Sequence, residues 1–261
     1  MKVYIGLDDS GRGPLIGPMV LGGVALTLTQ NEYLTSIGVK DSKLLSPSAR
    51  KRLEGEIKNN CLTYKIIKIS PEEIDFRLKA QVNLNKLEAI KFASLINDLV
   101  NEINAICKGK DHKDREKLEK EKIEKIIIVD CPSNNIIRWR AFLMHYLSNE
   151  VRGEIEKRET LLIAKHKAEQ HKCVAAASIL AKQEREREIA KLKKILNYDF
   201  GSGYPADPRT IKFLENYSKF KKLDEKLKFM RKSWATYKKK QTQKTKQKKL
   251  KDFLASIPWL I

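Results

Sequence analysis

The sequence predicts an α/β protein built on a mixed β-sheet with helices on its faces. Apolar, β-branched segments at 2–7 and 19–28 are joined by a turn rich in glycine and proline, which is typical of an early β-hairpin. Strand-like and helix-like segments then alternate along the chain, as they do where helices pack on a sheet. The 261 residues are enough to bury a full hydrophobic core.

Hydrophobic patterning places the elements in order. We expect strands at 2–7, 19–28, 62–70, 126–130 and 159–167, and helices at 46–59, 83–106 and 174–196. The strand "IIIVD" at 126–130 is apolar up to its last residue, as in a central strand covered on both faces. The first helix has Ser46 as its N-cap and Pro47 at its first position.

Two charged segments interrupt this pattern. The segment 107–125 is almost entirely charged, which predicts an exposed loop or a solvated helix. From about residue 238 the chain is too polar to bury a core, so we expect it to be disordered in isolation.

The charge balance indicates a polyanionic partner. With 53 Lys and Arg against 33 Asp and Glu, the formal net charge is +20, which favours nucleic acid ahead of an anionic membrane surface. The alternative is a surface merely coated with lysine, since much of the excess lies in the last thirty residues or so. No stretch approaches the roughly 20 apolar residues of a membrane span, and no leader is apparent, so we expect a soluble cytoplasmic protein.

The four cysteines do not predict a metal site or a disulfide framework. Cys61, Cys107, Cys131 and Cys173 lack CxxC or Cys/His ligand spacing, so we expect reduced thiols.

Three aspartates follow apolar strands. Asp8 and Asp9 come at the end of the first strand and Asp130 ends "IIIVD", so we expect them to converge at one rim of the sheet. Clustered carboxylates repel one another, and Mg²⁺ or Mn²⁺ is the usual compensation. Two such ions about 3.5–4 Å apart can activate water and stabilise the leaving oxygen of a phosphodiester. The alternative is that each aspartate caps a turn.

The turn after these aspartates suits a phosphate-bearing ligand. Gly11 and Gly13 let backbone amides approach a ligand closely, and Arg12 between them adds a charge suited to phosphate. A Gly-Arg-Gly sequence alone is weak evidence.

Five ordered blocks resemble type 2 ribonuclease H, with the last block most similar to archaeal members. These are "GLDDSGRGPLIGP" (6–18), "GVKDSKLLS" (38–46), "NLNKLEA" (83–89), "AKHKAE" with "AAASILAK" (164–182) and "FGSGYPADPRTIKFLENY" (200–217). The resemblance implies an RNase H-like fold, a five-stranded mixed sheet flanked by helices, with a small helical C-terminal region. It also implies cleavage of RNA–DNA hybrids and incision 5′ to single ribonucleotides in duplex DNA, leaving 3′-hydroxyl and 5′-phosphate ends.

The resemblance also assigns four acidic residues to two Mg²⁺ or Mn²⁺ ions. Asp8 and Asp130 match the family's first and third acidic positions, whereas Asp9 stands where glutamate is usual and Glu169 where aspartate is usual. Compared with the family's usual residues, the side chain at position 9 is one methylene shorter and that at position 169 one methylene longer. The chain from Glu169 to "AASI" is also one residue shorter than usual. We expect the two changes to compensate; the alternative is a weakly active or inactive site.

Further residues match the family's substrate contacts. Gly11, Arg12 and Gly13 match the turn that recognises the 2′-hydroxyl, the group that separates RNA from DNA. Tyr204 matches a tyrosine that stacks on the next sugar, and Lys43 a lysine near the phosphates. Lys167, Lys172 and Lys182 could contact the nucleic-acid backbone. A proton-shuttle or ligand role for His166 and His171 is not needed, because the acids already explain the chemistry, and Cys131 and Cys173 are expected to be packed thiols.

The C-terminal segment "QKKLKDFL" (247–254) resembles the peptide with which repair enzymes bind sliding clamps. Gln247, Leu250, Phe253 and Leu254 would carry that contact; the alternative is a helix that docks on its own domain. We therefore expect a catalytic domain at 1–196, a helical region at 197–237 that completes the substrate groove, and a tail at 238–261.

The sequence therefore predicts a monomeric, metal-dependent endoribonuclease acting on RNA–DNA hybrids and ribonucleotide-containing duplex DNA. One alternative is a hybrid-binding protein with a weakened or inactive metal site, which would bind in a salt-dependent manner without cleaving. Another is a different nuclease or integrase-type enzyme of the same fold; the Gly-Arg-Gly and Gly-Tyr-Pro blocks argue against it.

Overall fold

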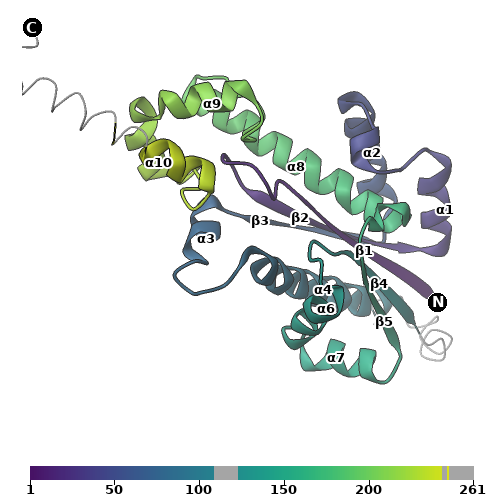
Figure 1. Cartoon of the computed structure of the whole chain (residues 1–261). Helices are drawn as coiled ribbons and strands as arrows, with labels where there is room; N and C mark the ends of the chain where they lie inside the picture. The colour runs from purple at the N-terminus through teal and green to yellow at the C-terminus, as the bar shows by residue number, and fades with distance from the viewer. Residues whose placement is uncertain (109–122, 243–245, 247–261) are drawn as a thin grey trace, which may run out of the picture. The chain divides into compact units, whose positions relative to one another are not determined.

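Five strands form one mixed sheet in the order β3-β2-β1-β4-β5 (Figure 1). The computed structural model describes residues 1–108, 123–242 and 246. Its strands are β1 (Lys2–Ser10), β2 (Met19–Thr27), β3 (Thr63–Ile69), β4 (Glu124–Asp130) and β5 (Thr160–Lys165). β2 is antiparallel to β1 and to β3, whereas β4 is parallel to β1 and to β5. The predicted α/β fold with a mixed five-stranded sheet is therefore confirmed.

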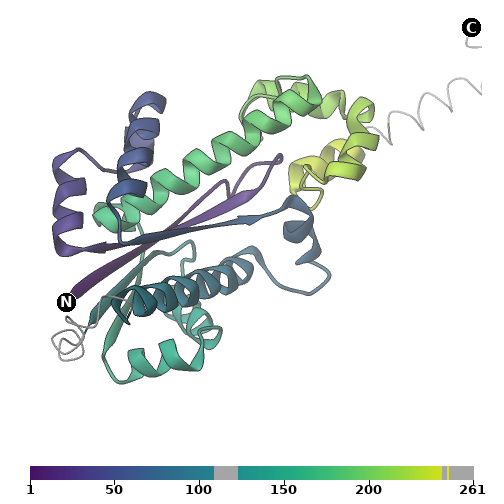
Figure 2. The same cartoon turned by 180° about the vertical axis from the view of Figure 1, so that it is seen from behind.

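Helices cover both faces of this sheet. On one face lie α4 (Leu84–Lys108), α6 (Ile136–His145) and α7 (Asn149–Glu156), and on the other α1 (Leu28–Ser36), α2 (Pro47–Asn60) and the first part of α8 (Lys172–Leu196) (Figures 1 and 2). Further helices are α3 (Pro71–Phe76), α9 (Pro208–Glu215) and α10 (Lys221–Leu227), and short 3₁₀ turns are η1 (Ser42–Leu44), η2 (Ala168–Gln170) and η3 (Tyr217–Phe220).

Backbone contacts divide the chain into two units. Unit 1 comprises Met1–Arg12, Met19–Ile69 and Gln81–Arg187, and so contains the whole sheet. Unit 2 comprises Gly13–Pro18, Ser70–Ala80 and the chain from Glu188 onward. Each has its own core: Val24, Ile128 and Ile179 belong to a cluster in unit 1, and Phe200 and Phe213 to one in unit 2.

Glycine allows α8 to begin directly against β1. A Cβ atom built on Gly6 would lie 2.1 Å from the carbonyl carbon of Cys173 and 2.2 Å from the nitrogen of Val174. One on Gly22 of β2 would lie 2.5 Å from the carbonyl oxygen of Ala177. Side chains at these two positions are therefore excluded, and the first turns of α8 are held next to the carboxylates of β1.

Several predicted boundaries are wrong for local reasons. The strand predicted at 19–28 ends at Thr27, because Thr27 and Gln30 form a capping box that starts α1 at Leu28. The strand predicted at 2–7 continues to Ser10, which pairs with Val20. The strand predicted at 159–167 ends at Lys165.

The charged segment 107–125 is not exposed throughout. Its last two residues begin β4, and Lys125 is buried, with its ammonium 2.9 Å from a carboxylate oxygen of Glu154. The ion pair with Glu154 compensates the buried charge of Lys125, which the sequence pattern predicts to be exposed to solvent. Residues 109–122 lie outside the described part of the chain.

The start of the C-terminal tail also differs from the expectation. Residues 235–242 are helical, and Lys240 pairs with Glu215 at 3.0 Å. The prediction of disorder from about residue 238 is therefore wrong for 238–242. Within the described ranges, no helix is long and apolar enough to cross a membrane.

Candidate active site

Asp8 and Asp9 lie inside β1 rather than after it, so their side chains point to opposite faces of the sheet. Asp8 is 4% exposed and accepts a hydrogen bond from the hydroxyl of Ser178 on α8. Ser178 Oγ in turn lies 2.9 Å from Ser42 Oγ. Asp9 is directed toward Glu88 of α4. The two adjacent carboxylates are therefore held by helices on different faces.

The other two acids meet where β4 ends. Asp130 is the last residue of β4, and its Oδ1 accepts a 2.9 Å hydrogen bond from the backbone amide of Ala168 in η2. Glu169, which follows Ala168 in η2, forms an ion pair through Oε1 with Lys43 Nζ at 3.2 Å. Lys43 lies in η1, where Asp41 caps the turn. The structure thus places Lys43 beside the predicted acids.

These carboxylates repel one another in a poorly solvated place. Burial raises the pKa of Asp8 well above its usual range, and the charges of Asp9 and Asp130 raise it further, against the hydrogen bond from Ser178. Burial likewise raises the pKa of Asp130, with the charges of Glu169 and Asp9 adding to it. Lost solvation pulls the pKa of Lys43 down, but its hydrogen bond and ion pair with Glu169 outweigh this and leave it raised.

The donor chemistry of this cluster suits a hard divalent cation. All four side chains offer oxygen ligands, and a cation would relieve their repulsion. As the side chains stand, no three His, Cys, Asp or Glu residues of the described ranges form a set that could hold a metal ion. The division of Asp8 and Asp9 between two faces accounts for this in part.

A buried acid at this site, Glu88, is not among the residues predicted from the sequence. Glu88 of α4 is fully buried and pairs with the guanidinium of Arg12, which also donates to the side-chain oxygen of Asn85. Burial and the charge of Asp9 raise the pKa of Glu88, whereas Arg12 opposes that rise. The available signal was the spacing of Asn85 and Glu88, which puts both on one face of α4.

The Gly-Arg-Gly turn passes from unit 1 into unit 2. Gly11 has φ 87°, a backbone conformation that favours glycine. Gly13 belongs to unit 2, where its carbonyl accepts a 3.0 Å bond from Trp234 Nε1. Also in unit 2, a Cβ atom built on Gly13 would lie 3.4 Å from the ring of Tyr204, which is 39% exposed.

Other candidate residues have structural partners. His166 Nδ1 lies 2.8 Å from the carbonyl oxygen of Cys131, and His171 Nε2 lies 3.4 Å from Lys165 Nζ. Lys172 donates to the carbonyl of Val39 at 3.0 Å. None of these three contacts involves a predicted acid.

Lys167 and Lys182 are the other two basic residues that the sequence places near the acids. Lys167 takes a left-handed backbone conformation before η2. Burial lowers the pKa of Lys182, and the charge of Arg50 lowers it further. The clamp-binding residues Gln247, Leu250, Phe253 and Leu254 lie outside the described residues.

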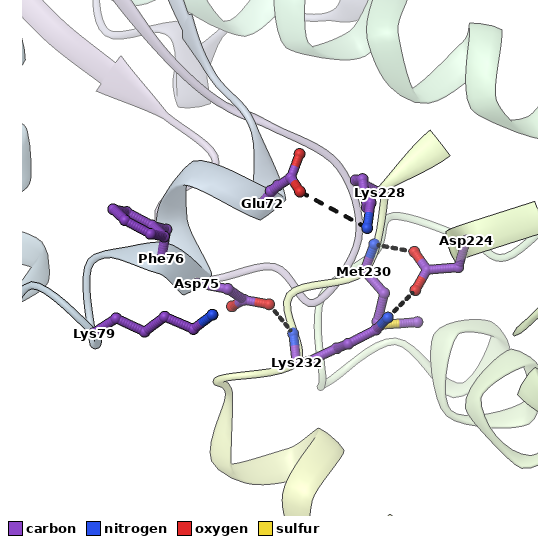
Figure 3. A pocket seen from close by; sticks show the side chains of 8 residues that line it. All are labelled: Glu72, Asp75, Phe76, Lys79, Asp224, Lys228, Met230 and Lys232. Carbon is purple, nitrogen blue, oxygen red and sulfur yellow. Dashed lines mark hydrogen bonds and ion pairs between the residues drawn. The ribbon is translucent and has the colours of Figure 1, made fainter. Parts of the chain in front are cut away.

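Unit 2 contains a separate hollow of about 310 Å³ (Figure 3). Acidic and basic side chains line it in equal number: Glu72, Asp75 and Asp224 with Lys79, Lys228 and Lys232. Asp75 accepts backbone bonds from Lys232 and Ser233, and Asp224 accepts one from Met230 and pairs with the Lys232 ammonium. These contacts fasten unit 2 together.

The five-stranded sheet, with an acid within β1 and another at the end of β4, defines an RNase H-like protein. A solved structure with the same fold, ribonuclease H2 from Pyrococcus horikoshii, superposes with a TM-score of 0.70 at 33% identity, covering 92% of this chain and 98% of that one. The sequence model of "Ribonuclease HII" matches residues 5–128 and 107–237. The chain therefore belongs to the ribonuclease HII family and is an endoribonuclease that cleaves RNA in RNA–DNA hybrids.

Two further relatives are archaeal. A ribonuclease HII from Nanoarchaeum equitans is 39% identical over 232 residues, which is 88% of this chain and 93% of that protein. A ribonuclease HII from Archaeoglobus fulgidus, solved as a complex with PCNA, superposes with a TM-score of 0.63 at 35% identity, covering 83% of this chain and 89% of that one.

Proposed function

We propose that this ribonuclease incises duplex DNA 5′ to a single embedded ribonucleotide and leaves 3′-hydroxyl and 5′-phosphate ends. The observation that carries the proposal is the cluster of the buried Asp8 and the half-buried Asp130, whose pKa values are raised by lost solvation and by neighbouring acids. Such a cluster is costly for folding unless a cation or a positively charged partner balances it.

Asp8, Asp9, Asp130 and Glu169 are the proposed ligands of two Mg²⁺ or Mn²⁺ ions. When bound, such ions supply activation of water and stabilisation of the leaving oxygen in phosphodiester hydrolysis. The protein contributes the orientation of its own groups. Ser178 holds the Asp8 carboxyl, and the Ala168 amide holds that of Asp130. No such ligand set is preformed among the described residues, so these side chains would have to move closer together to hold an ion.

The proposed substrate contacts follow the turn that comes after β1. We propose that Gly11, Arg12 and Gly13 recognise the 2′-hydroxyl through the backbone of the turn, since glycine has no side chain to keep a ligand away from it. The Arg12 side chain is directed to Glu88 and Asn85, which supports a role for the turn's backbone in recognition and for the guanidinium in holding the turn. Tyr204 is proposed to stack on the neighbouring sugar, and Lys43 to lie near a phosphate.

The exchange of side-chain lengths at positions 9 and 169 is tested by reversing it. We propose that Asp9 and Glu169 compensate for each other, so Asp9→Glu and Glu169→Asp should each slow cleavage of a duplex with one ribonucleotide, and the double variant should recover it. Cleavage is measured with Mg²⁺ and with Mn²⁺, and Asp8→Asn serves as the inactive control.

The results of these cleavage assays distinguish the proposed function from the two alternatives. Incision 5′ to the ribonucleotide by the unaltered protein supports the proposal. Tight hybrid binding without cleavage under either metal would indicate a hybrid-binding protein with a weakened site. Cleavage of a duplex made only of DNA would indicate a different specificity within the fold.

We also propose that residues 247–254 bind a sliding clamp. The support is the spacing of Gln247, Leu250, Phe253 and Leu254 and the Archaeoglobus fulgidus relative, which was solved with PCNA. Titration of an archaeal PCNA with the full chain and with its Phe253→Ala/Leu254→Ala variant tests this. Equal affinity of the two proteins would exclude this segment as the contact.

A further inference from the structure

Trp234 holds the end of the Gly-Arg-Gly turn that lies in unit 2. Its indole Nε1 donates a 3.0 Å hydrogen bond to the carbonyl oxygen of Gly13, which is 221 positions away in the sequence. The guanidinium carbons of Arg77 and Arg231 lie 5.6 and 5.1 Å from the centre of the indole ring, where cation–π attraction holds the ring in place. A side chain remote in the sequence therefore sets the orientation of this carbonyl.

The chain that leads to Trp234 is fixed by Asp75. One carboxylate oxygen accepts a 2.7 Å hydrogen bond from the backbone amide of Lys232 (Figure 3), and the other accepts a 3.0 Å bond from that of Ser233. Trp234 is the next residue, and the helix of residues 235–242 begins directly after it. Because its backbone is fastened on both sides, the indole can hold Gly13 in one position instead of following it.

The segment that begins at Gly13 is bonded to two other parts of unit 2. Leu15 donates its amide to the carbonyl oxygen of Gly203 at 2.7 Å, and its own carbonyl oxygen accepts a 2.8 Å bond from the amide of Arg231. Arg231 is fully buried, and its Nε donates to the carbonyl oxygen of Gly17 at 3.0 Å. These bonds join the segment to the two parts of the chain that carry the indole and the Gly-Tyr-Pro block.

Gly13 and Tyr204, two of the proposed substrate contacts, are therefore held in one frame. A Cβ atom built on Gly13 would lie 3.4 Å from the Tyr204 ring, and the residue before Tyr204 accepts the Leu15 amide. A substrate with a single ribonucleotide has one 2′-hydroxyl, so the turn and the ring must receive that hydroxyl and the next sugar at the same time. A continuous RNA strand has a 2′-hydroxyl on every residue, so a displaced turn still meets one.

We propose that Trp234 is a positioning residue that sets the preference of this ribonuclease for single ribonucleotides. By holding the Gly13 carbonyl it fixes the distance between the turn and the Tyr204 ring. The proposal rests on the proposed function, because that function assigns the 2′-hydroxyl to the turn and the neighbouring sugar to Tyr204. Because catalysis depends steeply on how the substrate lies relative to the acids, a shift of the turn should lower kcat more than it raises KM.

The test compares two substrates. Trp234→Phe removes the N–H donor and keeps an aromatic ring against the two guanidinium groups. Both kcat and KM are measured with Mg²⁺ for a duplex with one ribonucleotide and for a continuous RNA–DNA hybrid. On the first substrate kcat should fall about tenfold, which corresponds to the loss of one hydrogen bond. On the second it should fall about twofold or less, and KM should change by less than about twofold on either.

Tyr237→Phe is the matched control. It removes the hydroxyl of another aromatic residue of unit 2, whose ring packs edge-on against Tyr217, and it should leave the ratio of the two kcat values unchanged. Thermal unfolding of the two variants should give melting temperatures within about 3 °C of each other, as expected for similar small losses of stability.

A second variant keeps the indole N–H and loosens the ring. Arg77→Gln removes one of the two cations that hold the indole, so the ratio of the two kcat values should move in the same direction by about two- to threefold. This variant decides the proposal if Trp234→Phe does not fold.

Three outcomes are decisive against these assignments. Equal losses of kcat on both substrates would show that Trp234 supports only the fold, and would overturn the proposal. A kcat ratio for Trp234→Phe and Arg77→Gln equal to that of Tyr237→Phe would overturn it as well. An unaltered chain that cleaves the continuous hybrid but not the duplex with one ribonucleotide would overturn the proposed function, and this proposal with it.

Discussion

Arg12, in the turn that follows β1, forms an ion pair with Glu88, whose carboxylate on α4 is fully buried. The same carboxylate faces Asp9, which raises its pKa. Glu88 therefore depends on Arg12 for its balancing charge. Arg12→Ala should lower the free energy of unfolding by about 3 kcal/mol, because removing one partner leaves a buried charge uncompensated. Urea unfolding measures this change.

A second substitution separates stability from recognition. Adding Glu88→Gln to Arg12→Ala removes the unpaired charge, so the double variant should regain most of the lost stability. Its cleavage of the single-ribonucleotide duplex should remain slow, because the turn no longer has the Arg12 side chain that holds it to α4. If the two substitutions destabilise additively, the pair does not act as described.

The raised pKa of Asp8 predicts that its charge destabilises the metal-free protein. A carboxyl with a raised folded-state pKa binds protons more tightly in the folded state, so stability falls as pH rises from the unfolded pKa through the folded one. Asp8→Asn should therefore stabilise the protein at pH 7.5 in EDTA, because it removes a buried charge that the folded state disfavours. Thermal unfolding should show a gain of about 2–4 °C for each kcal/mol.

Asp98→Asn is the control for this prediction. Asp98 is an exposed acid on α4, and its substitution should change stability by less than about 0.5 kcal/mol. The gain from Asp8→Asn should also be smaller at pH 4 than at pH 7.5, because the raised pKa leaves less charge on the unaltered carboxyl as the pH falls. A gain that is the same at both pH values would show that burial of charge is not its cause.

Two glycine substitutions test the close approach of α8 to β1. Gly6→Ala would put a Cβ atom 2.1 Å from the backbone of Cys173, so α8 must move away and the protein should lose more than about 3 kcal/mol or fail to fold. Gly55 of α2 has nothing within 4 Å of such an atom. Gly55→Ala should therefore stabilise the protein by about 0.5–1 kcal/mol. Equal effects of the two substitutions would contradict this packing.

Much of the fold was predictable because hydrophobic patterning reports on burial. The run "IIIVD" identified the central strand β4, and Ser46 with Pro47 identified the start of α2. The ends of elements were less predictable, because they depend on pairing and capping. The β1–β2 ladder extends β1 to Ser10, and the capping box at Thr27 ends β2.

The site was predictable in its residue types but not in its geometry. The sequence identified Asp8, Asp9 and Asp130 but placed the first two at a strand end, where they would converge. They lie within β1, where their side chains alternate between its two faces, and the charge of Asp9 still raises the pKa of Asp8 and that of Asp130. The role of Ser178 could not be predicted, because it follows from how α8 packs on the sheet; for Glu88 the spacing from Asn85 showed a shared helix face but not its burial against Arg12. Burial of Lys125 depends in the same way on Glu154.

The thiols beside the acids should be unreactive in the folded protein. Burial raises the pKa of Cys173 to about 12, and burial likewise raises that of Cys131. The thiolate is the reactive form, so at pH 8 iodoacetamide should modify these two far more slowly than the half-exposed Cys107. Mass spectrometry of labelled peptides measures each rate, and all four cysteines should react alike in urea. Fast native labelling of Cys173 would mean that the start of α8 opens away from Gly6, which would also remove the support that this helix gives to Asp8.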